Sequence, residues 1–153
     1  MEKSKSLINR YNTFGLRERW LEYYLNHTEN YFDTTNHGLN VKKQLPVFKK
    51  WLVDCNILDG QDVTEDGKLM SQVYFQAKIK CWEIIWTNLC NNSELFAWYI
   101  ERCNFAQPYK KDSLDNMLSD DFPQYTATVR ENSLKAVSYT HPEPTRPLYI
   151  SYA

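Results

Sequence analysis

The chain has 153 residues, of which 42% are hydrophobic, 24% charged and 15% aromatic. This composition is typical of one globular domain and excludes a chain kept disordered by low hydrophobicity and high charge. The formal net charge of −1 argues against a protein held to nucleic acid or membrane by its overall charge.

The N-terminal region is expected to begin with a loose segment and continue as a helix. Residues 1–12 are mostly polar and charged, and we expect them to form a flexible lead-in. Thr13 is placed to cap a helix over residues 14–25, in which apolar side chains recur at three-and-four spacing.

The segment around Pro46 resembles a helix-turn-helix unit. Proline is costly inside a helix but suits its first turn, so Pro46 is expected to separate a short helical turn from a new helix over residues 47–58. Thr64 is a natural cap for the next helix. The phrase at residues 63–68, Val-Thr-Glu-Asp-Gly-Lys, is similar to one found in many winged-helix domains. Strand content is expected only as a short wing near residues 59–64.

The C-terminal half is predicted to be built on a helical hairpin. Apolar stripes predict helices over residues 79–89 and 93–103, with Trp82 and Trp86 facing the core. A short helix near residues 113–118 precedes a final helix over 129–139, which Thr126 or Thr128 opens. We therefore expect one mainly α domain over residues 13–153. Its winged-helix-like part (13–77) packs on a helical part (78–140), and a proline-rich tail (141–153) follows.

Residue patterns that would indicate catalysis or metal binding are missing from the sequence. There is no phosphate-binding loop, no G-x-S-x-G elbow and no H-E-x-x-H. The cysteines lack C-x-x-C spacing, and the three of the four that fall within apolar helical stretches are expected to be buried, while the histidines are expected at the surface. The acidic residues at 112, 115, 120 and 121 are expected to form a solvated loop. We therefore predict no catalytic residue, no metal and no cofactor.

The sequence predicts a cytoplasmic protein that does not enter a membrane. There is no signal peptide, no apolar run near 18 residues and no cysteine pattern of a secreted domain.

Positive charge is concentrated in the first third of the chain. Residues 1–53 carry nine Lys and Arg against five Asp and Glu, whereas residues 54–153 carry nine against 14. Lys42, Lys43, Lys49 and Lys50 flank Pro46, where a recognition helix would present its first residues to DNA phosphates. The alternative interpretation is that Lys49 and Lys50 form an ordinary solvated helix face.

Several phrases together carry a family resemblance. They are Phe14 to Leu25, Leu45 to Leu58, Val63 to Leu69, Cys81 to Leu89 and Thr128 to Leu134. In this order they resemble the C-terminal region of large bacterial phosphoadenosine phosphosulfate (PAPS) reductase-like proteins, and a related uncharacterised domain of DNA phosphorothioation gene islands. The resemblance implies a domain appended to a nucleotide-binding, sulfur-handling enzyme. That family's phosphate loop and iron–sulfur cysteines match no position here, so no catalytic residue is carried over.

The leading functional hypothesis is therefore a non-catalytic accessory domain that acts through protein or nucleic-acid contacts. Its expected partner is a PAPS reductase-like enzyme domain or subunit, with DNA as a second candidate. One alternative is a fragment that completes a neighbouring nucleotide site, clamping the nucleotide with Arg17 or Arg19. Another is a purely structural oligomerisation module built on the Trp-rich hairpin.

Overall fold

The protein is described by a computed structural model that places residues 5–34, 36–104, 107–140 and 150–151. Within these ranges the chain is mainly helical, as predicted. Its helices are α1 (Glu18–Asn26), η1 (Tyr31–Asp33), α2 (Gln44–Asp54), α3 (Glu65–Val73), α4 (Lys78–Asn92), α5 (Glu94–Arg102), α6 (Lys111–Asp121) and α7 (Ala127–Ser138). Four two-residue strands complete the described elements: β1 (Leu58–Asp59), β2 (Asp62–Val63), β3 (Tyr109–Lys110) and β4 (Ile150–Ser151).

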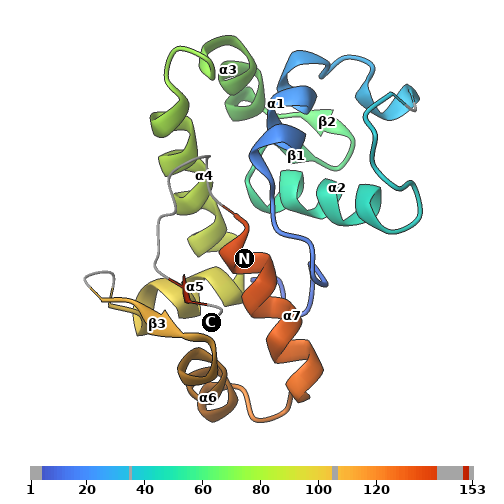
Figure 1. Ribbon diagram of the computed structural model, residues 1–153. Helices are drawn as coiled ribbons and strands as arrows, with labels where there is room; N and C mark the ends of the chain where they lie inside the picture. Colours follow the sequence, from blue (N-terminus) through green and yellow to red (C-terminus); the bar gives the residue numbers. More distant parts are fainter. Residues whose placement is uncertain (1–4, 35, 105–106, 141–149, 152–153) are drawn as a thin grey trace.

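The helices form two groups that share one long helix. Figure 1 shows α1, α2, α3 and the β1–β2 hairpin gathered at one end of the molecule, and α5, α6 and α7 at the other. Helix α4 runs between the two groups and packs on both α2 and α5. The buried apolar side chains form one continuous core that extends through both groups.

Residues 6–12 pack into the core instead of forming the expected flexible lead-in. Ile8 and Tyr11 are 1% and 0% exposed, and the Tyr11 ring stacks on Trp51 with their centroids 3.7 Å apart. The backbone of Ser6 is fixed at the α4–α5 junction, where its amide donates to the Asn92 carbonyl (2.8 Å). These long-range contacts outweigh the polar composition of the segment. Residues 1–4 lie outside the described part of the chain.

Helix α1 begins at Glu18, so the prediction that Thr13 caps it is wrong. The residues before the helix are held by the C-terminal end of α7. The Leu16 amide donates to Thr140 Oγ1 (3.0 Å), and a Cβ at Gly15 would lie 2.6 Å from the Ala136 carbonyl oxygen. Only a glycine allows this close approach, and it keeps residues 14–16 outside the helix.

Helix α2 runs unbroken from Gln44 to Asp54, so the predicted break at Pro46 is wrong. Pro46 lies in the first turn, where an amide hydrogen has no partner inside the helix and its loss costs nothing. Asn40 prepares this turn, because its Oδ1 accepts from the amides of Lys42 and Lys43. With no helix ending at Pro46, the winged-helix arrangement is not confirmed.

A short β-hairpin follows α2, at the place where strand content was predicted near residues 59–64. Strands β1 and β2 pair antiparallel, with Leu58 opposite Val63. Gly60, with φ of +63°, supplies the left-handed turn residue. Thr64 then caps α3, its Oγ1 accepting from the Gly67 amide (3.0 Å). The parallel pairing of β3 with β4 was not predicted, because it joins residues about 40 positions apart without a local turn.

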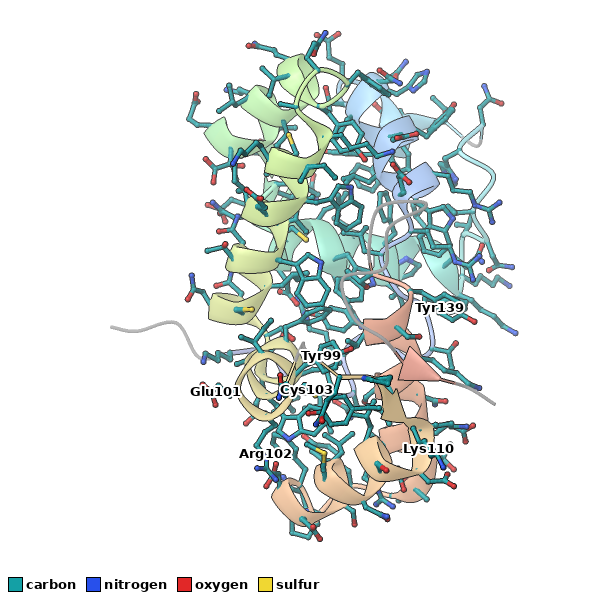
Figure 2. The ribbon with its side chains drawn as sticks, turned by 60° about the vertical axis from the view of Figure 1, so that its left-hand side comes forward. Tyr99, Glu101, Arg102, Cys103, Lys110 and Tyr139 are labelled. Atoms are coloured by element: carbon teal, nitrogen blue, oxygen red, sulfur yellow. The ribbon has the colours of Figure 1, made fainter. Side chains whose placement is uncertain are left out.

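The helical hairpin predicted for the C-terminal half is confirmed as α4 and α5. Trp82 is buried and its Nε1 donates to the Tyr74 hydroxyl (3.0 Å), whereas Trp86 is only half-buried, against Phe96. Figure 2 shows Tyr99 turned toward the middle of the molecule and Glu101 on its outer side. Thr126, and not Thr128, caps α7 by accepting from the Val129 amide. Residues 141–149 of the proline-rich tail lie outside the described part.

Candidate functional site

The cations of the N-terminal part differ from those of the C-terminal part in having few acidic partners. Among the described residues, eight Lys and Arg side chains form ion pairs, and seven of these eight follow residue 54: Lys68, Lys78, Lys80, Arg102, Lys111, Arg130 and Lys135. The eighth is Arg10. Described cations that pair with no described acid are Lys5, Arg17, Arg19, Lys42, Lys43, Lys49, Lys50 and Lys110. Uncompensated positive charge therefore gathers in residues 5–50.

The four lysines singled out in the sequence lie along α2 and the turn before it. Lys42 and Lys43 are exposed, and Lys43 is the residue that precedes the helix. Lys50 follows Lys43 by seven residues, which is two helical turns, so the two lie on the same side of α2. Lys49 lies on a neighbouring side, with its Nζ 5.3 Å from the Phe32 ring centroid. The structure thus places Lys49 and Lys50 on α2 and Lys42 and Lys43 in the turn before it, and the four do not lie on one line.

A buried carboxylate at the end of α2 binds the N-terminal segment. The side chain of Asp54 is 7% exposed, and its Oδ2 accepts from Arg10 Nε (2.9 Å), Ser6 Oγ (3.1 Å) and the Tyr11 hydroxyl. Burial, and then the negative charge of Asp54, raise the pKa of Tyr11 far above its usual value, so Tyr11 remains a donor. Because a buried carboxylate is costly unless it is paired and hydrogen-bonded, this network fixes residues 6–11 against α2.

Arg10 and Asp54 were missed in the sequence. The available signal was Asp54 itself, an acidic residue next to Val53 and Cys55 in the apolar run that ends the helix. Such a residue requires a cationic partner, but the partner lies 44 positions away and no local spacing identifies it.

Arg17 and Arg19, either of which could clamp a nucleotide, lie at the start of α1 in different surroundings. Arg17 precedes α1, and its guanidinium carbon lies 5.7 Å from the Trp20 ring centroid and 5.4 Å from that of Tyr139. Arg19 is exposed, and residues two apart in a helix do not face each other.

The thiols and imidazoles occupy the places expected of structural groups. Cys55, Cys81 and Cys103 are buried and Cys90 is half-buried, so burial was correctly predicted for three of the four. Burial raises the pKa of every one of these thiols, which keeps them protonated. The rings of His27 and His37 stack on Tyr23 and Tyr31. His141 lies outside the described residues.

The part of the chain that the structure describes contains neither a metal-binding cluster nor a membrane-spanning helix. No three His, Cys, Asp or Glu side chains gather there in a way that could hold a metal ion. No helix there is both long and apolar enough to cross a membrane. The acidic residues at 112, 115, 120 and 121 lie in helix α6, so the predicted loop is wrong. Two of them pair with cations: Asp121 Oδ2 accepts from Arg102 Nε (2.7 Å), and Asp115 Oδ1 accepts from Arg130 Nε (3.1 Å).

Comparison with known proteins gives no relative: no family model, no curated protein and no solved structure matches this chain.

Proposed function

We propose that this chain is a cytoplasmic, non-catalytic binding domain whose basic N-terminal surface contacts the phosphates of DNA. The observation that carries the proposal is the grouping of uncompensated cations in residues 5–50, with Lys42, Lys43, Lys49 and Lys50 along α2. The resemblance to PAPS reductase-like proteins supports a PAPS reductase-like enzyme domain or subunit as the partner beside which the domain works.

Unpaired and ion-paired lysines differ in how readily they can neutralise a DNA phosphate and release its counterion. A lysine that forms no ion pair can neutralise a phosphate and free a condensed counterion, whereas a paired lysine must first give up its carboxylate. The C-terminal cations are largely of the second kind, as in Lys68 with Glu65 and Lys80 with Glu83. With a whole-chain net charge of −1, the contact is expected to be weak and to need the partner domain.

Helix α2 followed by the β1–β2 hairpin supports a winged-helix-like mode of contact. In such a mode the helix approaches a groove and the hairpin approaches the adjacent backbone. We retain this arrangement as part of the proposal, with α2 as the helix that approaches DNA.

The two alternative functions have less support. A nucleotide clamp would rely either on Arg17, whose guanidinium already lies against Trp20 and Tyr139, or on Arg19 as a single exposed side chain. An oligomerisation surface on the α4–α5 hairpin would have to use the exposed Ile79, Ile84 and Ile100, because Trp82 and Trp98 are buried. Binding to DNA therefore remains the favoured proposal.

A salt titration with duplex DNA tests the proposal. Four phosphate contacts give a plot of log K against log salt with a slope of about −3.6, taking about 0.9 per contact. Changing Lys49 and Lys50 together to Ala is expected to flatten the slope by about two units. Both side chains are half-exposed, so the circular dichroism of the variant should match that of the wild type. Equal slopes for the two proteins, or no binding at low salt, would remove DNA as the ligand.

A further inference from the structure

A groove lies beside the Asp54 network, between residues 5–12 and the C-terminal half of α2. Its volume is about 660 Å³, and Asn92 at the end of α4 also contributes to its wall. Sites for small molecules usually measure about 300–1,000 Å³, so the groove has the size of one such ligand.

The charged side chains that line the groove are Lys5, Arg10, Lys50 and Asp54. The one carboxylate is already engaged, because Asp54 Oδ2 accepts three hydrogen bonds and Arg10 offsets its charge. Lys5 and Lys50 pair with no acid in the described part of the chain. The groove therefore presents two uncompensated positive charges to a ligand.

The remaining lining favours a polar ligand. Three asparagines, Asn9, Asn12 and Asn92, line the groove beside the apolar Leu7 and Val53, and the Asn92 amide already donates to the Asp54 carbonyl (2.9 Å). Asn9 and Asn12 are exposed, so their NH₂ groups can donate to a ligand.

Arg10 supplies a donor whose position is already fixed. Its Nε donates to Asp54 Oδ2 (2.9 Å), which orients the guanidinium, and within the described part of the chain its two terminal nitrogens remain for a ligand. Phosphate oxygens are strong acceptors for such charge-assisted hydrogen bonds, and Arg and Lys are the side chains that usually bind them.

We propose that this groove binds a small phosphorylated molecule with at least two negative charges, held by Lys5, Arg10 and Lys50. The proposal goes beyond the contact with DNA, since it concerns a bounded pocket and shares only Lys50 with the four lysines of that surface. Neither proposal requires the other to hold.

The test uses inorganic pyrophosphate as the probe, with the full chain at low ionic strength. Isothermal titration should show saturable binding to the wild type, and NMR should show shifts in the side-chain amide signals of Asn9 and Asn12. Lys50→Ala should weaken binding about five- to tenfold, because it removes one charge-assisted contact. The matched control is Lys49→Ala, which removes the same charge one residue away, beside Phe32, and should change affinity by less than about twofold.

The outcomes separate the groove from the DNA surface. Absence of saturable pyrophosphate binding, or equal weakening by Lys49→Ala and Lys50→Ala, would overturn the groove. For DNA, by contrast, the slope of log K against log salt should flatten by a similar amount in both single variants, since each removes one phosphate contact. If the protein does not bind DNA but its affinity for pyrophosphate is weakened by Lys50→Ala alone, only the proposed function is removed and the groove stands.

Discussion

Asp121, at the end of α6, joins α6 to α5 through two hydrogen bonds to one oxygen. Its Oδ2 accepts from Trp98 Nε1 (2.6 Å) and from Arg102 Nε (2.7 Å). The Trp98 hydrogen bond, followed by that from Arg102, lowers the pKa of Asp121 below its ordinary 3.8. These bonds require the charged carboxylate, and so their strength depends on pH.

The pH dependence has a definite sign. Because the pKa of Asp121 is lower in the folded state, its bonds stabilise the fold above about pH 4 and are lost as the pH falls below 3.8. Asp121→Asn should therefore lower the free energy of unfolding at pH 7 by about 0.5–1 kcal/mol, a value reduced for solvent exposure. The difference from the wild type should shrink at pH 3, as urea unfolding at the two pH values would measure.

Asp120→Asn is the matched control for this prediction. It makes the same chemical change one residue earlier, at an exposed side chain that forms no ion pair with another described residue. A pH-independent effect of Asp121→Asn, or an equal effect of Asp120→Asn, would show that the carboxylate of Asp121 does not join the helices.

At the scale of elements, α4 shows what an apolar stripe can and cannot predict. The stripe correctly placed Trp82 in the core, but Trp86, on the same stripe, is only half-buried. The two tryptophans differ in burial because different elements pack against them. Trp82 faces Tyr74 at the end of α3. The described ring contacts of Trp86 are only with Phe96 and Tyr99, which both lie on α5.

This difference predicts unequal effects on stability. Trp82→Ala should lower the free energy of unfolding by about 3–5 kcal/mol, and Trp86→Ala should lower it by less. Trp82→Phe retains most of the ring but loses the bond to Tyr74, and should cost about 1 kcal/mol plus some packing. Urea unfolding measures all three variants. A Trp82→Ala midpoint equal to that of the wild type would contradict the burial of this side chain.

The elements that sequence reasoning predicted are those fixed by local signals. Thr64 and Thr126 cap helices because their hydroxyls reach amides three residues on, a spacing visible in the sequence. The start of α1 and the packing of residues 6–12 depend instead on partners 43 to 125 positions away in the chain. Leu16 bonds to Thr140, and Ser133 Oγ donates to the Ile8 carbonyl (2.9 Å). Such contacts have no local signature.

The residues of the candidate surface were likewise predicted only where they are close together in the sequence. The four lysines around α2 were identified from the sequence because they are close together in it. Lys5 and Arg10 were not, because they reach α2 only when residues 6–11 pack on Asp54. Pro46 was misread because a proline in the first turn and a proline between two helices have the same local sequence.

At the scale of the whole molecule, ion-paired and unpaired cations are distributed unequally along the chain. Most described cations after residue 54 are paired with acids, whereas most of those before it are not. Binding to a polyanion is therefore expected to depend on where a lysine lies and not on how many lysines remain.

A comparison of two double variants, each lacking two positive charges, tests this claim most directly. Lys42→Ala with Lys43→Ala removes two exposed, unpaired lysines, while Lys68→Ala with Lys80→Ala removes two exposed lysines paired with Glu65 and Glu83. In duplex DNA titrations over a range of salt, the first variant should flatten the log K slope by about two units. The second variant should leave that slope near the wild-type value. Equal losses in the two variants would contradict the account, because they would show that only the net charge of the chain matters.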